Sequence, residues 1–124
     1  MNKLRRTDRG ATMVESALML PLLLLLIFGM VEFSRAYNAK VTVTHAAREG
    51  VRVLAITGDP VAAADAAEGA GTSLDPASMT ITNTPCVPAQ PTELTVSYPF
   101  TYEIPFFGTN TLTLQATGVM RCSG

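Results

Sequence analysis

The sequence predicts an α+β protein in which a long N-terminal membrane-spanning helix continues as an amphipathic stem and packs on a small exterior domain. We expect that domain to hold a three-stranded antiparallel sheet and one short helix. Three observations predict this class. Residues 16–31 carry 13 apolar side chains and no charge, residues 33–54 carry apolar side chains at helical spacing, and the chain from residue 78 onward alternates apolar and polar residues.

The composition excludes two broad classes of protein. The chain has 124 residues, of which 48% are hydrophobic and 15% charged, and its formal net charge is −1. Without the apolar segment and the basic residues before it, too little chain remains for the core of a large multidomain enzyme. The charge balance also argues against a nucleic-acid binder, whose surface would be basic. We therefore expect neither nucleic acid nor a small-molecule substrate as a partner.

Charge is distributed unevenly along the chain. Residues 1–10 have a formal charge of +3, and residues 54–124 have a formal charge of −5 with a single basic residue, Arg121. The basic residues of the N-terminal segment are Lys3, Arg5, Arg6 and Arg9. Because Lys and Arg beside an apolar span favour the cytoplasmic side, this asymmetry predicts a cytoplasmic N-terminus and a C-terminal part outside the membrane.

The apolar segment has the length that a bilayer requires. Residues 11–31 would form a helix of roughly 30 Å, which matches the hydrocarbon thickness of a membrane. We expect one span in the cytoplasmic (inner) membrane, and four parts of the chain. These are a cytoplasmic leader peptide (1–10), a transmembrane helix (11–31), an amphipathic stem helix (32–57) and a small exterior α+β domain (58–124). A cleavable secretory signal is a weaker alternative, because Glu32 and Arg35 lie where a small-residue cleavage site would be expected.

Glu15 is the one charged residue inside the span. A carboxylate at the centre of a bilayer costs about 2.5–3.5 kcal/mol, but near the cytoplasmic edge its side chain can reach the headgroups. One interpretation is therefore an interfacial glutamate without a specific role. The other is that Glu15 pairs with a cation, since cleavage after Gly10 would expose a new ammonium group on Ala11 and make Glu15 the fifth residue.

Gly10, the following Ala11-Thr12-Met13-Val14-Glu15 and the apolar helix together resemble the processing site of type IV-like prepilins. The longer segment from residue 9 to residue 52 resembles, more narrowly, the TadE-like pseudopilins of tight-adherence (Tad/Flp) pilus systems. The features that carry this resemblance are the glutamate at the start of the helix, Pro21, the leucine run, Val31-Glu32-Phe33 and Ala46-Ala47-Arg48-Glu49-Gly50.

The resemblance implies that a membrane prepilin peptidase cuts between Gly10 and Ala11 at the cytoplasmic face. It also implies that Glu15 pairs with the new N-terminus of a neighbouring subunit, and that the partners are other pilins or pseudopilins and the Tad secretion machinery. The membrane, and the pilus after assembly, are the expected locations. One departure is that Ala11 is not aromatic, which puts N-methylation of the first mature residue in doubt.

The shape and the packing of the long helix can be predicted from Pro21 and from the residues after the span. Pro21 removes a backbone donor in mid-span, which predicts either a helix kink or a tolerated membrane proline. The helix is expected to extend to about residue 56. One apolar stripe follows helical spacing: Phe33, Tyr37, Val41, Thr44, Ala47, Val51 and Leu54. We expect this stripe to pack against the chain's own sheet or against another subunit.

Turn and capping residues divide the exterior part. Gly58 is expected to end the stem, and Asp59 to cap a short helix over residues 61–68. Strands are predicted at residues 79–82, at 94–98 with 100–104, and at 112–116, where threonine occupies one face. Pro99 predicts a bend or an edge, and residues 105–108 predict the last turn.

Cys86 and Cys122 are the only cysteines, and both lie in the part predicted to be exterior. Outside the cytoplasm such a pair most simply forms a disulfide. A two-cysteine metal site is the alternative, which we discount because the single histidine, His45, lies on the stem. We expect no metal and no cofactor.

No catalytic constellation is recognisable in the sequence, so we do not expect an enzyme. Two hypotheses about function remain. The first is a structural component of a Tad/Flp pilus, a processed pseudopilin that acts in pilus biogenesis and adhesion. The alternative is a signal-anchored envelope protein whose exterior domain is a binding module, with Glu15 incidental.

Overall fold

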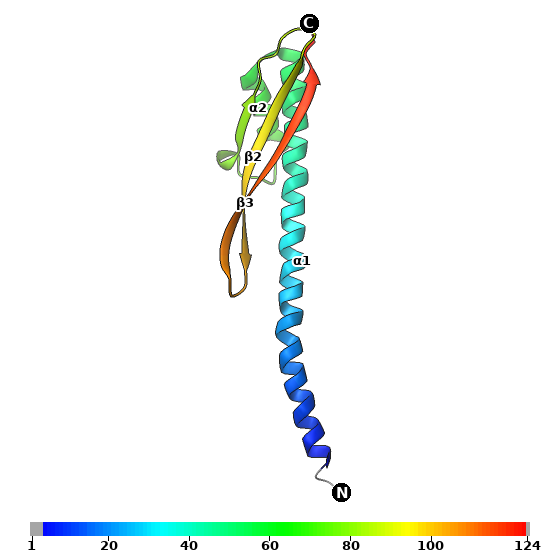
Figure 1. Cartoon of the computed structure of the whole chain (residues 1–124). Helices are drawn as coiled ribbons and strands as arrows, with labels where there is room; N and C mark the ends of the chain where they lie inside the picture. Colours follow the sequence, from blue (N-terminus) through cyan, green and yellow to red (C-terminus); the bar gives the residue numbers. More distant parts are fainter. Residues whose placement is uncertain (1–3, 124) are drawn as a thin grey trace.

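The structure, a computed structural model, describes residues 4–123 and confirms the predicted α+β class. The elements in chain order are α1 (Leu4–Thr57), α2 (Pro60–Ala70), the 3₁₀ helix η1 (Pro76–Ser78), β1 (Thr80–Asn83), β2 (Pro91–Ile104) and β3 (Gly108–Arg121). Figure 1 shows α1 running the length of the molecule, with all other elements gathered beside its C-terminal half.

Helix α1 has 54 residues, which corresponds to about 80 Å at the standard rise. It continues without interruption from the apolar segment into the stem, as predicted. It ends where Gly58 takes a φ of +69°, and the Gly58 amide donates a hydrogen bond of 2.8 Å to the carbonyl of Leu54. Glycine suits this position because side chains disfavour a left-handed backbone.

Helix α2 begins at the predicted cap and packs along α1. The carboxylate of Asp59 accepts a hydrogen bond of 2.9 Å from the amide of Val61, and Pro60 occupies the first helical position. Ala63 and Ala67 are its buried residues. A Cβ added at Gly50 of α1 would lie 3.0 Å from the Cβ of Ala67, so small residues on both helices allow the close approach.

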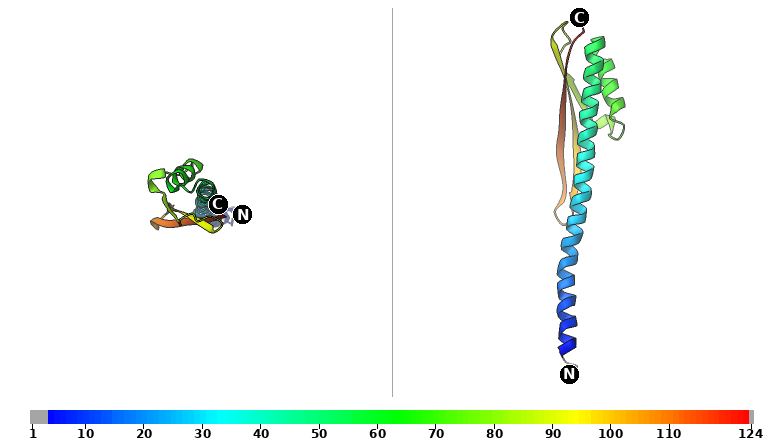
Figure 2. Two further views of the ribbon diagram at one scale, coloured as in Figure 1. Left: turned by 90° about the horizontal axis from the view of Figure 1, so that it is seen from above. Right: turned by 90° about the vertical axis from the view of Figure 1, so that its right-hand side faces the viewer.

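The sheet has the order β1-β2-β3, and both pairings are antiparallel. β2 and β3 form a long hairpin, in which Pro91 pairs with Arg121 at one end and Ile104 with Gly108 at the other. Figure 2 shows the sheet and α2 on neighbouring sides of α1. Leu94, Val96 and Phe100 of β2 are buried beneath the sheet, and intervening residues such as Thr95 and Thr101 point away from α1.

β2 and β3 are longer than the sequence predicts, β1 has the predicted length but begins one residue later, and β2 continues through Pro99. The amide of Thr84 donates a hydrogen bond of 3.0 Å to the carbonyl of Glu93, so the backbone groups of Glu93 face the β1 side of β2. Residues two apart in a strand bond in the same direction, so Pro99 faces that side as well. Because β1 pairs with β2 only as far as Ser97, no partner strand lies opposite Pro99. The missing amide donor therefore leaves no ladder bond unmade.

Only part of the predicted apolar stripe of the stem packs within the fold. Ala47, Val51 and Leu54 are buried as expected, but Phe33, Tyr37 and Val41 are 73%, 64% and 50% exposed. The residues that bury the first part of the stem are smaller and lie on an adjoining face; they are Ala39, Val43 and Ala46. Hydropathy favoured the aromatic residues, whereas packing selected the face on which the sheet and α2 can approach closely.

Candidate functional site

The segment predicted to be processed lies on the free N-terminal part of α1. Gly10, Ala11 and Glu15 are helical and exposed, and no atom lies within 4 Å of a Cβ built on Gly10. Ala11 and Glu15 are four residues apart, so both face the same side of the helix. Of the basic residues in the leader, Arg5, Arg6 and Arg9 belong to α1, and Lys3 lies outside the described residues.

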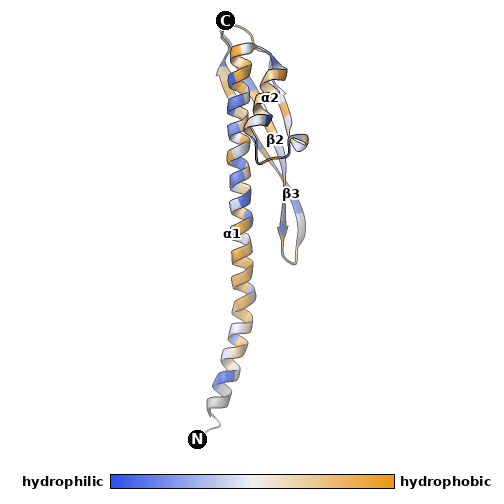
Figure 3. Ribbon diagram, turned by 180° about the vertical axis from the view of Figure 1, so that it is seen from behind, coloured by the Kyte–Doolittle hydropathy of each residue, from blue (hydrophilic) through white to orange (hydrophobic). Residues whose placement is uncertain are grey.

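The apolar segment makes no contact with the rest of the fold over most of its length. Every residue from 8 to 31 is exposed, and the leucines at 22–26 are between 42% and 62% exposed. Figure 3 shows an apolar band on the N-terminal half of α1 that no other element covers. By its length and composition the helix could cross a bilayer, which suggests a single-pass membrane protein. Pro21 lies inside the unbroken helix, which curves gently (Figure 3).

Two basic residues connect the stem to the hairpin just beyond the apolar band. The guanidinium of Arg35 lies 2.8 Å from a carboxylate oxygen of Glu32 and 5.7 Å from the centre of the Phe100 ring. The ammonium of Lys40 donates to the backbone carbonyl of Gln115 on β3. These contacts hold the β2–β3 hairpin against the first turns of the stem.

A separate apolar face on the stem has no partner among residues 4–123. It consists of Phe33, Tyr37 and Val41, the exposed part of the predicted stripe. Their spacing of four residues keeps them on one side of α1, away from the buried Ala39 and Val43. We call these three residues the stem face.

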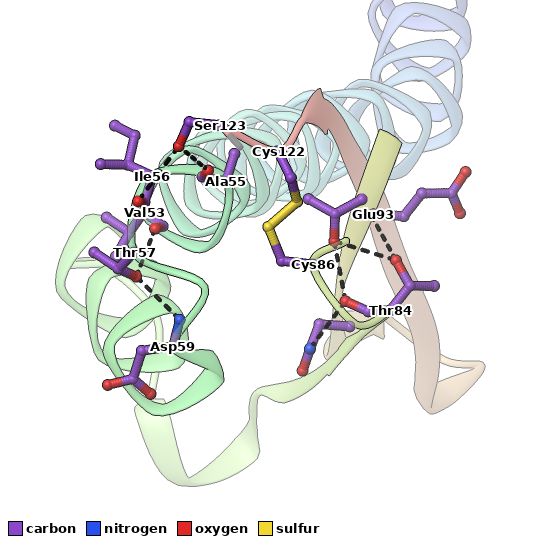
Figure 4. Close-up of a disulfide and its surroundings, with 12 residues drawn as sticks. Val53, Ala55, Ile56, Thr57, Asp59, Thr84, Cys86, Glu93, Cys122 and Ser123 are labelled. Carbon is purple, nitrogen blue, oxygen red and sulfur yellow. Dashed lines mark hydrogen bonds between the residues drawn. A yellow bond between two sulfur atoms is a disulfide. The ribbon is translucent and has the colours of Figure 1, made fainter. Parts of the chain in front are cut away.

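Cys86 and Cys122 form a disulfide, and their Cα atoms are 5.7 Å apart (Figure 4). Beside it, the amide of Cys122 donates to the carbonyl of Gln90 at 2.9 Å. The next residue, Ser123, reaches the end of α1, where its amide and its hydroxyl donate to the carbonyl of Ala55 at 2.9 and 2.8 Å. The disulfide and Ser123 thus hold the C-terminal segment against the last turn of α1, whose carbonyls lack helical partners. Sequence reasoning did not identify this role of Ser123.

No arrangement of metal-ligating groups is present among residues 4–123. No three His, Cys, Asp or Glu side chains come together in this part of the chain. His45 is exposed on the stem, where it lines a shallow surface hollow together with Lys40 and Arg48.

The turn between β2 and β3, which the sequence predicts only as a turn, exposes two aromatic side chains. Phe106 and Phe107 are 97% and 77% exposed at its tip. The amide of Phe107 donates to the carbonyl of Ile104 at 3.0 Å, which closes a tight turn. The tip and the helix residues Phe28 and Glu32 line one cleft of about 400 Å³. The consecutive aromatic residues in a predicted turn could have indicated this exposed apolar tip from the sequence alone.

The comparison with protein families places the predicted site in a known context. Residues 10–52 match the family described as TadE-like protein, which is 43 of the 124 residues. This region begins at Gly10 and includes Glu15, Pro21 and the stem face. No curated protein and no solved structure matches the chain. Residues 10–52 are therefore a TadE-like region, as the sequence resemblance predicted, and this region associates the chain with the Tad pilus.

Proposed function

We propose that this chain is a pseudopilin of a Tad/Flp pilus, cut after Gly10 by a prepilin peptidase and assembled with other pilins through its N-terminal helix. The observation that carries the proposal is the TadE-like match, which begins at the residue where cleavage is expected. That match and the exposed apolar helix support the proposed role in pilus biogenesis, to which we add adhesion as part of the proposal.

The leader and the glycine suit a peptidase at the cytoplasmic face. Each basic residue near an anionic leaflet contributes about 1 kcal/mol of attraction, which would hold the scissile bond at the headgroups. Gly10 has no side chain, so its backbone can leave the helix and enter a narrow cleft at little energetic cost. No other element covers this segment within the described residues, so a peptidase could reach it directly.

Glu15 supplies the assembly contact in this proposal. Its carboxylate would meet the ammonium group that cleavage creates on Ala11 of a neighbouring subunit. Within a bundle of apolar helices the dielectric is low, so removing one partner of such a pair is strongly destabilising. The exposed position of Glu15 on α1 leaves its side chain open to another subunit.

The stem face extends the surface available for assembly. Lipid can cover residues 16–31 and the adjoining Phe33, but Tyr37 and Val41 lie further along the stem and would face water in an isolated subunit. Long helices of this kind pack in bundles, and burying these side chains between subunits would favour a filament or its base. The exterior domain, with a formal charge of −5 over residues 54–124, would then lie on the outer surface of the assembly.

The test is the intact mass of the protein extracted from membranes of cells with an active prepilin peptidase. We expect a mature chain that starts at Ala11. Gly10→Leu should block cleavage, because the added side chain would not fit the peptidase cleft. Gly29→Leu is the matched control, since Gly29 also lies in an exposed part of α1 with no atom within 4 Å of an added Cβ. A full-length wild-type chain in such cells would contradict the proposal and favour a signal-anchored envelope protein.

A further inference from the structure

The β2–β3 hairpin ends beside the last turns of the apolar segment. Its tip lines a common cleft with Phe28 and Glu32 of α1, and residues 16–31 are the uncharged apolar run. Figure 1 shows the hairpin pointing from the exterior domain toward the N-terminal end of α1. If residues 16–31 occupy the hydrocarbon of a bilayer, the tip must lie at the membrane surface where α1 leaves it.

The tip has the composition that a membrane interface favours. Phe106 is 97% exposed and Phe107 is 77% exposed, although aromatic side chains of this size are normally buried. Residues 104–120 contain no charged side chain, and the polar or charged side chains of Glu103, Thr109 and Asn110 flank the tip where the two strands begin. An apolar end with a polar collar matches the gradient from acyl chains to headgroups, where aromatic residues are enriched.

The backbone of the turn gives a second, independent observation. Phe106 has a φ of +72°, a left-handed conformation that glycine or asparagine adopts far more readily. The turn therefore holds a large aromatic residue where the backbone alone would favour a small or polar one. Nothing within residues 4–123 covers this side chain, so it is free to contact a partner outside the fold.

We propose that the tip of the β2–β3 hairpin, Phe106 and Phe107, inserts into the outer interface of the bilayer that α1 crosses. The hairpin is then a second membrane contact, which fixes the angle and rotation of the exterior domain above the membrane. The Arg35 contacts with Glu32 and Phe100 hold the hairpin and the stem together just above this level. We assign lipid as the partner of the tip because the tip lies beside the end of the apolar run of α1. A second copy of the chain is the alternative partner, and the test below distinguishes the two.

The inference rests on the membrane crossing of α1 and does not require cleavage or pilus assembly. It can fail while the proposed function stands, and it can hold if the intact-mass test contradicts that function. The experiment therefore uses the full chain in phosphatidylcholine vesicles, with and without brominated acyl chains. The chain contains no tryptophan, so one introduced tryptophan reports a single position.

Phe106→Trp is the test variant, and two other tryptophan variants serve as references for a position inside the bilayer and a position in water. Leu23→Trp reports the middle of the span, and Val87→Trp reports an exposed apolar position, 44% exposed, in the loop at the other end of β2. We expect brominated lipid to quench Phe106→Trp at least ~2-fold more than Val87→Trp, and Leu23→Trp most strongly, in line with an interfacial depth. Dissolved iodide should quench Val87→Trp more than Phe106→Trp.

Three results would overturn the proposal. Equal lipid quenching of Phe106→Trp and Val87→Trp would place the tip in water. Protection from iodide without lipid quenching would show that protein covers the tip. Absence of lipid quenching for Leu23→Trp would show that α1 does not cross the bilayer. A double variant, Phe106→Asn with Phe107→Trp, removes the Phe106 ring and keeps a residue that suits the left-handed turn. Lipid should quench its tryptophan less than it quenches that of Phe107→Trp alone. Unchanged quenching would contradict a role for Phe106.

Discussion

Small residues determine how closely the stem approaches the sheet. A Cβ built on Gly118 of β3 would lie 2.7 Å from the carbonyl oxygen of Ala47 and 2.7 Å from a methyl carbon of Val51. A Cβ built on Gly50 would lie 3.0 Å from the Cβ of Ala67 and 3.0 Å from the methyl carbons of Leu94. The Ala46-Ala47-Arg48-Glu49-Gly50 motif, which contributed to the family resemblance, thus has a packing role. Its small members lie where β2, β3 and α2 meet α1.

Gly118→Ala should lower the free energy of unfolding by about 1–3 kcal/mol, because the added methyl group overlaps backbone that cannot move freely. Denaturant unfolding of the full chain in detergent micelles measures this change. Gly69→Ala is the matched control on α2, where no atom lies within 4 Å of the added Cβ. It should be neutral or stabilising by up to about 1 kcal/mol, since alanine favours a helix. Equal effects of the two substitutions would refute the close-packing explanation.

Glu15→Gln should leave membrane insertion and leader cleavage intact but reduce the amount of the protein assembled into pili. Glutamine has the same size and lacks the charge that would pair with the terminal ammonium group. Cell-fractionation and recovery of sheared pili measure assembly, and intact mass measures cleavage. Met13→Leu, two residues away on the exposed helix, is a control for substitution in this segment. Normal piliation in the Glu15→Gln strain would rule out the pairing.

At the scale of elements, the two ends of the hairpin have different tasks. The open end is fixed to the stem by the Cys86–Cys122 disulfide and by the hydrogen bonds of Ser123 to Ala55. The closed end extends beyond the small core and presents Phe106 and Phe107. A domain with so few buried residues gains much of its stability from the covalent link at the open end.

Replacing both cysteines by serine should reduce the stability of the exterior part by about 4 kcal/mol, as the chain-entropy model gives for a loop closed over 36 residues. Thermal unfolding of the full chain in micelles, followed by circular dichroism, measures the loss. Reductant should lower the midpoint of the wild-type chain and leave that of the Cys86→Ser, Cys122→Ser variant unchanged. A wild-type midpoint that does not respond to full reduction would contradict the prediction.

At the scale of the whole molecule, the chain has one half with a core and one half without. α2 and the sheet bury one side of the C-terminal half of α1, whereas the apolar N-terminal half is bare (Figures 1 and 3). The stem face lies between the two, past the end of the apolar run and on a side of α1 that adjoins the buried side. This position makes it the surface where subunit contacts outside the membrane are expected.

A photo-crosslinking residue at Tyr37 should capture other pilin or pseudopilin subunits in cells that assemble the pilus. The same residue at Thr113, which is exposed on the outward side of the sheet, is the control and should give much less product. Denaturing gels followed by mass spectrometry identify the partners. Crosslinking from Thr113 that equals or exceeds that from Tyr37 would assign the subunit contact to the sheet instead of the stem face.

Local rules were sufficient where the determining residues are close in sequence. The apolar run of residues 16–31, the stop at Gly58 and the Asp59 cap of α2 each depend on neighbouring residues, and the structure agrees with these predictions. The predicted cleavage after Gly10 and the pairing of Glu15 also follow from local sequence. These two remain predictions, because they concern events that involve other molecules.

The sequence by itself determined that the chain is a long apolar helix followed by a small α+β part, because helical periodicity, alternation and capping are local properties. Only the tertiary structure decided which face of the stem is buried, since that depends on how closely β3 can approach Ala47. It also decided that β2 passes through Pro99, because β1 stops short of it, and that Phe106 at the hairpin tip lines one cleft with Phe28 and Glu32 of α1. These features depend on contacts between distant residues, which no local pattern encodes.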